Sequence, residues 1–296
     1  MITYSIKDLE RLSGIKAHTI RIWEKRYELI FPKRTTTNIR YYDSDDLKQV
    51  LNIAILNRNG IKISKIATMN SEEIAQKVLA LSTSNTSEEA QIETLLVAMM
   101  EFDDERIKTV LTNCSIRMGF EDTVIKVIYP FFNKVGLLWQ LNSINPAHEH
   151  YISNIIRQKL IVAIDGLSSN ATTNAKTFLL FLPEGELHEL GLLFYNYLIL
   201  KAGHKVLYLG QSVPLENVAT TIVQSPADYL VTSIHSSLSE EDFINKLNRI
   251  GEKLPQIPVI LTNRIEFDIN SSTIDQLSVN LSTEAFNEML NTDKIT

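Results

Sequence analysis

The sequence predicts a multidomain chain that joins α-helical domains to an α/β domain with a doubly wound parallel sheet. Three observations support this fold class. A basic segment with short helix-like stretches occupies residues 1–66, helical periodicity runs from Glu88 to about Asp165, and short apolar runs alternate with helix-like stretches after Asn174. The length of 296 residues gives room for two or three domains, which we expect at 1–75, 88–170 and 175–296.

Composition excludes several classes of protein. A single cysteine, Cys114, allows neither an intrachain disulfide nor a cysteine-based zinc site, and it suits a reducing compartment. The first residues lack the basic-then-apolar pattern of a signal peptide, and the longest apolar stretch, "LGLLFYNYLIL", is too short to cross a bilayer. We therefore expect a cytoplasmic protein without membrane contact.

Charge is unevenly distributed along the chain. The first 66 residues carry 13 Lys and Arg against 7 Asp and Glu, whereas the whole chain has a net charge of −6. The remainder is therefore strongly acidic. A basic head on an acidic body predicts that only the head meets a polyanion.

The head begins with two short predicted helices. "YSIKDLERLSG" has a capping box made of Ser5 and Asp8, and Gly14 ends it. "KAHTIRIWEKRY" follows, with Ile20, Trp23 and Tyr27 on the inward face and the basic side chains on the opposite side. Two short helices joined by a glycine turn are typical of a helix-turn-helix.

A hairpin and a third helix complete the predicted head. "FPKRTTTNIRYYD" is expected to form a β-hairpin wing, and the next helix is expected to start at a Ser44 cap and to end at Gly60. Such a head binds duplex DNA through cations on phosphates and helix side chains on base edges. The alternative is a small helical interaction domain with a solvated basic face. The candidate DNA-contacting residues are His18, Thr19, Arg21, Lys25, Arg26, Arg34, Arg40 and Tyr41.

The head resembles the winged helix-turn-helix of the MerR family over about residues 2–70. The resemblance lies in "TIRIWEKRY", "PKR" and "IRYYDSDDL", and its Arg-x-Trp-Glu-x-Arg-Tyr form is most similar to the branch whose members carry cobalamin-binding domains. It implies a regulator that binds double-stranded promoter DNA as a pair on inverted repeats. Thr37 and Asn38 stand where the family often has a glycine in the wing.

The middle of the chain predicts a four-helix bundle. A Ser/Thr/Asn cluster at 82–87 is expected to be an inter-domain linker. Four helical stretches follow, separated by short loops: one around Leu95 and Met99, one around Val110 and Cys114, and then "EDTVIKVIYPFFNKVGLLWQ" and "NPAHEHYISNIIRQKLIVAIDGL".

The C-terminal part predicts a Rossmann-like domain. The apolar runs "TFLLFL", "KVLYLG", "DYLVTSI" and "PVILT" lack alternation, as buried parallel strands do, and helix-like stretches separate them. Ligands of such sheets bind at the carboxyl ends of the strands. His188 lies just after the first predicted strand, within "EGELHELG", where a binding site is expected.

The pattern Glu186-x-His188-x-x-Gly191 resembles the fingerprint of cobalamin-binding domains. The resemblance implies that His188 is the lower axial ligand of cobalt, that Glu186 hydrogen-bonds its other ring nitrogen, and that Gly191 lets the backbone pass close to the cofactor. It also implies that Ser233, after the third strand, touches the cofactor's tail. The alternative is a histidine near a helix start that binds nothing. The chain departs from the family at His235 and at Asn263 and Arg264, the latter two in place of a Gly-Gly pair.

A second pattern lies in the predicted bundle. Trp139 is followed after nine residues by Glu149 and His150, which resembles the signature of light-sensing, adenosylcobalamin-binding MerR regulators. The resemblance implies that Trp139 covers the upper face of the corrin and that Glu149 and His150 contact the adenosyl group. The alternatives are a core tryptophan with a solvated Glu-His pair, or zinc on His148, His150 and His188. Residues two apart on a helix face different ways, which disfavours zinc.

Together these features predict a DNA-binding, homo-oligomeric regulator, a dimer or a tetramer, that senses adenosylcobalamin and through it light. No catalysis is needed for that function. Two other functions are compatible with parts of the sequence. One is a MerR-type regulator whose sensor domain is empty or binds another small molecule. The other is a corrinoid subunit that carries a methyl group, which would leave the basic head without a role.

Overall fold

The structure is a computed structural model of the chain. It describes residues 3–84, 87–140, 144–167, 174–234, 240–254, 257–262, 274, 277–279 and 281–292, without the side chains of 79–84, 139 and 140. The chain divides into two compact units, Met1–Ile155 and Ile156–Thr296. Each unit is described by itself below.

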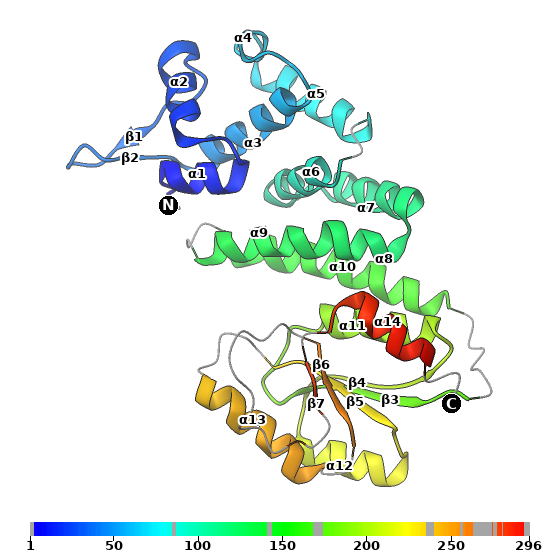
Figure 1. Ribbon diagram of the computed structural model, residues 1–296. Coiled ribbons are helices and arrows are strands. Elements are labelled where there is room, and N and C mark those ends of the chain that lie inside the picture. Colours follow the sequence, from blue (N-terminus) through cyan, green and yellow to red (C-terminus); the bar gives the residue numbers. More distant parts are fainter. Residues whose placement is uncertain are drawn as a thin grey trace. The chain divides into compact units, whose positions relative to one another are not determined.

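The first unit opens with the winged helix-turn-helix that the sequence predicts. Helices α1 (Ile6–Ser13) and α2 (Ala17–Tyr27) precede the antiparallel strands β1 (Lys33–Arg34) and β2 (Arg40–Tyr41), which form a narrow hairpin (Figure 1). The capping box of Ser5 and Asp8 is present, and Gly14 ends α1 with a left-handed φ of 69°. The prediction for the head is confirmed in these elements.

Helix α3 (Ser44–Arg58) corrects one detail of the prediction. Its cap is Asp43 and not Ser44, because the Asp43 carboxylate accepts the Asp46 N–H at 3.0 Å and the Asp46 carboxylate accepts the Asp43 N–H at 2.9 Å. An aspartate one position earlier therefore caps the helix in place of the expected serine, and it forms a capping box with Asp46. Asn59 follows the helix, and Gly60 adopts a φ of 82°.

Helix α3 is shared between the head and the bundle. Residues Val50–Leu56 are buried without interruption, and α3 contacts α1 as well as α5 (Ser71–Ser84) and α6 (Glu88–Glu101). A helix that is buried on all sides has neighbours on all sides. The short helix α4 (Ile63–Ile66) links α3 to α5.

Helix α5 overturns part of the predicted linker. It continues to Ser84, so the start of the Ser/Thr/Asn cluster is helical and does not form a loop. Tertiary packing against α3 and α6 explains how helix formation outweighs the weak helix propensity of Ser and Thr. Positions 85 and 86, also part of the predicted linker, lie outside the described residues.

One arginine joins three helices at this junction. The guanidinium of Arg58, at the end of α3, hydrogen-bonds the Ser13 carbonyl at the end of α1 and the Glu93 carboxylate of α6. It also lies 3.2 Å from Glu89. Glu93 is fully buried, and desolvation raises its pKa to about 7, although Arg58 and Lys134 oppose that rise and Glu89 adds to it.

The predicted bundle is confirmed. After α6 come α7 (Asp104–Met118), a run made of α8 (Phe120–Thr123), the π-helical turn η1 (Val124–Ile128) and α9 (Tyr129–Gln140), and then α10 (Pro146–Asp165). The π turn ends two residues before Pro130, which lacks an N–H for the regular helical ladder. Helix α10 begins in the first unit and ends in the second.

The second unit is the predicted doubly wound domain. Its five parallel strands have the order β4-β3-β5-β6-β7. They are β3 (Thr177–Pro183), β4 (Lys205–Val213), β5 (Tyr229–Thr232), β6 (Val259–Leu261) and β7 (Leu277–Ser278). The sequence predicts the first four, whereas β7 and the final helix α14 (Thr283–Thr292) were missed.

Helices cover both faces of this sheet (Figure 1). Helices α12 (Leu215–Gln224) and α13 (Glu240–Lys253) pack on the face that carries Leu179 and Phe181. Helix α11 (Leu190–Lys201) contacts β3 and β4, and Tyr195 of α11 packs edge-on against Phe286 of α14. The strand order reverses at β3, so the loop that follows β3 lies at the topological switch point where such sheets bind ligands.

Candidate functional site

The head presents the predicted DNA-contacting residues on an exposed surface of α2 and the wing. Ile20 and Trp23 of α2 are buried against the head's core. Thr19 and Tyr41 are half-buried, and the exposed members of the set are His18, Arg21, Lys25, Arg26, Arg34 and Arg40. The structure therefore brings a cluster of cations to one α-helix and one hairpin, which suits a groove flanked by phosphates.

The wing is held in a defined conformation. Asn38 takes a left-handed φ of 64° at the tip, where the family often has glycine, and asparagine tolerates that region better than most residues. Its side-chain oxygen accepts a hydrogen bond of 2.6 Å from Arg34. Arg40 lies 3.5 Å from Glu24 of α2, and Tyr42 donates to the same carboxylate. The wing thus docks on α2 through Glu24.

The second candidate site lies in the turn between β3 and α11. The His188 side chain is 73% exposed, whereas the Glu186 side chain is only 4% exposed. The Glu186 carboxylate lies 2.7 Å from Nδ1 of His188 and accepts the backbone N–H of the same residue at 2.9 Å. A carboxylate on Nδ1 fixes the ring and favours the tautomer whose Nε2 carries a lone pair for a metal.

The end of β4 supports this turn from the side, which the sequence did not reveal. Ser212 accepts the Gly185 N–H at 3.1 Å and donates its own N–H to the Glu186 carbonyl at 3.2 Å. Gln211 donates to the Leu187 carbonyl at 2.7 Å. Ser212 holds a left-handed φ of 51°, a strained backbone position of the kind that gathers at binding sites.

A second buried acid, Glu189, was also missed. Its side chain is 6% exposed and is paired with Arg157 of α10. It also accepts a hydrogen bond of 3.2 Å from the Tyr208 hydroxyl of β4. Burial, reinforced by this carboxylate, raises the pKa of Tyr208. An acid next to a candidate ligand was the only signal in the sequence, because partners 32 and 19 positions away leave no local pattern.

The bundle carries the remaining predicted residues. Trp139 lies in the last turn of α9, and Glu149 and His150 lie in the first turns of α10. His150 Nδ1 is 3.0 Å from Glu149, and the Ser153 hydroxyl donates to Glu149 at 2.7 Å. His148 instead packs on the Phe102 ring at 4.5 Å between ring centroids, and desolvation lowers its pKa.

The other residues implied by the resemblance are less informative. Ser233 follows β5 and is half-buried. A Cβ added to Gly191 would have no neighbouring atom within 4 Å, so there is room for a ligand beside the backbone at this position. His235, Asn263 and Arg264, where the sequence departs from the family, lie outside the described residues.

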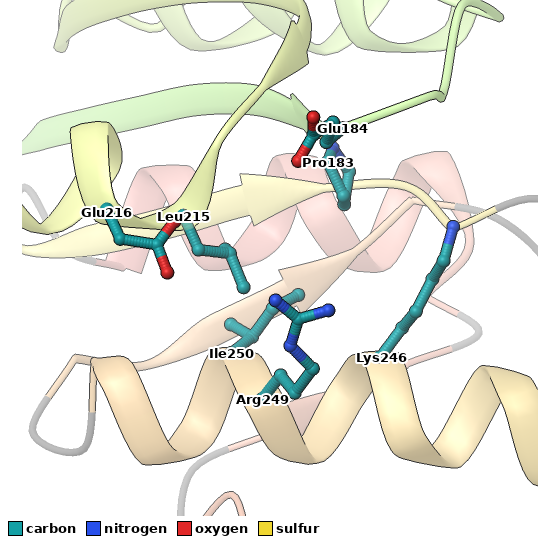
Figure 2. A pocket seen from close by; sticks show the side chains of 7 residues that line it. All are labelled: Pro183, Glu184, Leu215, Glu216, Lys246, Arg249 and Ile250. Atoms are coloured by element: carbon teal, nitrogen blue, oxygen red, sulfur yellow. The ribbon is translucent and has the colours of Figure 1, made fainter.

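A small pocket lies nearby, between the end of β3 and the helices α12 and α13. Its volume is about 50 Å³, and Lys246 and Arg249 reach into it from α13 while Glu184 and Glu216 line the other side (Figure 2). A space of that size suits a few water molecules and not a macrocycle. The pocket is therefore too small to be the binding site of a macrocyclic cofactor.

The donors at the sheet edge limit the kind of metal that they could bind. Within the described part of the chain, no group of three His, Cys, Asp or Glu side chains could hold a bare ion. A single exposed imidazole with its Nδ1 fixed fits a metal that already carries most of its ligands, such as one in a macrocyclic ring. The residues present therefore fit a corrinoid.

Two family models match the chain. The model "MerR HTH family regulatory protein" matches residues 4–73, and the model "B12 binding domain" matches residues 91–163. The chain is thus a DNA-binding transcriptional regulator that combines a MerR-type head with a B12-binding domain. It is homologous to the HTH-type transcriptional repressors CarH and CarA of Myxococcus xanthus.

The similarity to these relatives extends over most of the chain. CarH is 27% identical over 87% of this chain and 87% of its own length, and CarA is 26% identical over 88% and 86%. Among solved structures, the Methanosarcina barkeri monomethylamine corrinoid protein matches 70% of this chain and 97% of its own, with a TM-score of 0.53 at 15% identity. That match shows the fold alone. In the described residues no helix is both long and apolar enough to cross a bilayer.

Proposed function

We propose that this chain is a transcriptional regulator that binds promoter DNA with its head and adenosylcobalamin with its sensor part, and that light changes its assembly. The observation that carries the cofactor proposal is the Glu186–His188 pair. An exposed imidazole whose Nδ1 lies 2.7 Å from a buried carboxylate stands at the switch point of a parallel sheet.

Each predicted residue has a distinct role in this proposal. Nε2 of His188 would bind cobalt from below, and Glu186 would hold the ring. Trp139 would shield the upper face, and Glu149 with His150 would contact the adenosyl group. A flat indole excludes water, and a carboxylate accepts hydrogen bonds from a sugar or a base. Gly191 would leave room for the corrin, and Ser233 would contact the tail.

The bound cofactor would supply a cobalt–carbon bond that visible light breaks. The chain's own residues would convert that event into a change of assembly. Contacts of Glu149 and His150 would exist in the dark state only, which gives the difference in interaction free energy that any population shift requires. The head would then bind operator DNA as a homo-oligomer, a dimer or a tetramer, in one state more tightly than in the other.

The proposal assigns one task to each part of the chain. Residues 1–75 would contact DNA, residues 88–170 would cap the cofactor, and residues 175–296 would carry it. No step requires catalysis by the protein, so we propose a regulator and not an enzyme. This agrees with the curated relatives, which are transcriptional repressors.

The test uses the full chain and free adenosylcobalamin in the dark. Uptake should appear as a visible absorption spectrum that co-elutes with the protein in gel filtration. Green light should then change both the elution volume and the affinity for duplex DNA. A protein without cofactor uptake would leave a MerR-type regulator with an empty or differently liganded sensor. Uptake without any response to light would keep the sensor and remove the photoreceptor.

A further inference from the structure

Glu189 is buried beside one of the most exposed functional side chains of the second unit. Its side chain is 6% exposed, although the preceding residue, His188, is 73% exposed. Glutamate is almost never fully buried unless it is paired. The fingerprint Glu-x-His-x-x-Gly leaves this position open, so the motif itself does not explain why an acid stands there.

The partners of Glu189 come from two separate elements. One carboxylate oxygen pairs with Nε of Arg157, in the second half of α10. The other accepts a hydrogen bond of 3.2 Å from the Tyr208 hydroxyl in the middle of β4. The Glu189 main chain adds two local bonds, since its N–H donates to the Leu187 carbonyl at 3.0 Å and its carbonyl accepts the Leu193 N–H at 2.9 Å.

Glu186 and Glu189 therefore have different mechanical roles. Glu186 orients the imidazole from within the same turn, whose main chain also bonds Ser212 and Gln211 of β4. Glu189 connects the turn to a helix and to a strand outside it. The connection matters because the turn lacks regular secondary structure between Pro183 and Leu190. A ligand on such a segment needs support from groups outside the segment to hold its geometry.

We propose that Glu189 is a positioning residue for His188: by tying the turn between β3 and α11 to Arg157 and Tyr208, it sets the direction in which the imidazole faces a corrinoid metal. This inference rests on the proposed cobalamin binding. It adds a buried acid on the C-terminal side of His188 to the acid that the fingerprint already contains on the N-terminal side.

A purely structural role makes a different prediction. Removing one partner of a buried ion pair destabilises the fold, so if Glu189 serves folding only, its replacement by glutamine should cost stability and leave the metal ligation unchanged. A positioning role predicts a change in metal ligation in the protein molecules that remain folded and loaded.

The experiment uses the full chain with hydroxocobalamin and, in the dark, adenosylcobalamin. Glu189→Gln keeps the shape of the side chain and removes the charge. We expect its apparent dissociation constant to rise about 10-fold, the lower end of the range for outer-shell partners of metal ligands. At saturating cobalamin, part of the bound cofactor should show the visible bands of the form without a lower ligand. Free imidazole should restore the ligated bands.

Tyr208→Phe provides a second, milder variant that removes one hydrogen bond of 3.2 Å and no charge. It should shift the spectrum in the same direction by a smaller amount. The matched control is Glu184→Gln. Glu184 is an exposed acid in the same turn, and among the described residues its side chain has no hydrogen bond or ion pair. It should behave as wild type. Circular dichroism melts of all three variants report folding.

The outcomes separate this inference from the function on which it rests. If wild-type protein takes up no cobalamin, both are overturned. If wild type binds with a lower ligand while Glu189→Gln and Tyr208→Phe give the wild-type spectrum at saturation, only the positioning role is overturned. The same holds if Glu189→Gln lowers the melting temperature and the occupancy but leaves the ligated bands intact.

Discussion

The proposed DNA-contacting surface of the head and the carboxyl edge of the sheet place their candidate side chains in opposite ways. On the head, Arg21, Lys25 and Arg34 are exposed long side chains, positioned mainly by the helix and the hairpin that carry them. At the sheet edge, one exposed imidazole stands between two acids whose side chains are 4% and 6% exposed. The head distributes its chemistry over many groups, and the edge concentrates it on one atom.

This difference teaches where each region is sensitive. Phosphate contacts are numerous and each contributes a fraction of the affinity, so losing one is tolerated. A metal bond has no substitute, and its geometry depends on buried partners. We therefore expect graded losses from substitutions in the head and abrupt losses at the sheet edge.

The largest effect should follow from His188→Ala. Loss of the only imidazole in the β3–α11 turn should abolish measurable cobalamin binding, since even outer partners of metal ligands cost about 10-fold to 100-fold. Equilibrium dialysis with hydroxocobalamin measures this. DNA affinity without cofactor should stay at the wild-type value. If His188→Ala binds cobalamin as tightly as wild type does, binding at the sheet edge does not depend on this one side chain.

The second prediction concerns the buried carboxylate of the first unit, Glu93. Its pKa is raised from 4.5 to about 7, so the folded chain keeps a proton that the unfolded chain loses. The stability that Glu93 contributes is therefore fully present below about pH 4.5 and is lost as the pH rises through about 7, by a total of roughly 3 kcal/mol from this group. Urea unfolding of the first unit between pH 5 and pH 8 should show this decline.

Glu93→Gln should remove that decline and make the unit more stable than wild type above pH 7. Arg58 keeps Glu89 as a partner at 3.2 Å, so the substitution does not isolate its charge. The control is Glu88→Gln, on an exposed residue of the same helix, which should leave the pH dependence in place. DNA affinity should not change, because Glu93 lies at the junction of α3 with α6 and not on the basic surface. If Glu93→Gln instead lost most of its DNA affinity, DNA binding by the head would also depend on a buried acid.

Sequence patterns predicted the elements that rest on local chemistry. The capping box of Ser5 and Asp8, the wing, the bundle helices and four strands have short-range signals, and so does the place of His188 after β3. The site's predicted residues Glu186 and His188 do come together, because a spacing of two within one turn fixes their contact.

The remainder depends on contacts that no local pattern encodes. The strand β7 is two residues long and gains its place from pairing with β6. Helix α5 extends into the predicted linker because α3 and α6 pack against it. The support of the turn by Ser212, Arg157 and Tyr208 joins segments far apart in sequence. Burial of Glu189 follows from that long-range packing and could not be predicted from composition.

The third prediction tests whether α2 reads bases. His18 and Arg21 are both exposed on α2. Arg21→Ala should relax sequence preference by about 1–3 kcal/mol at one base pair, because a good bidentate contact contributes that discrimination. The measurement compares wild type and variant on a duplex selected from a random pool and on its single-base variants. An equal loss on every duplex would assign Arg21 to phosphate instead.

The smallest effect should separate the two arginines of the wing. Arg40 lies 3.5 Å from the Glu24 carboxylate, whereas Arg34 bonds the neutral Asn38 at 2.6 Å. Glu24 already offsets part of the charge of Arg40, so Arg34 should release more counterion on binding DNA. Both are exposed, and neither is expected to read a base.

Arg34→Ala should therefore weaken binding to a selected and an unrelated duplex alike, and it should reduce the slope of log affinity against log salt by about 1. Arg40→Ala should reduce that slope by less. Fluorescence anisotropy titrations at several salt concentrations measure both slopes. Lys205→Ala, on an exposed residue of β4 in the second unit, is the control. If Arg34→Ala and the control give the same slope, the wing does not contact phosphates. The DNA-contacting surface of the head would then consist of α2 alone.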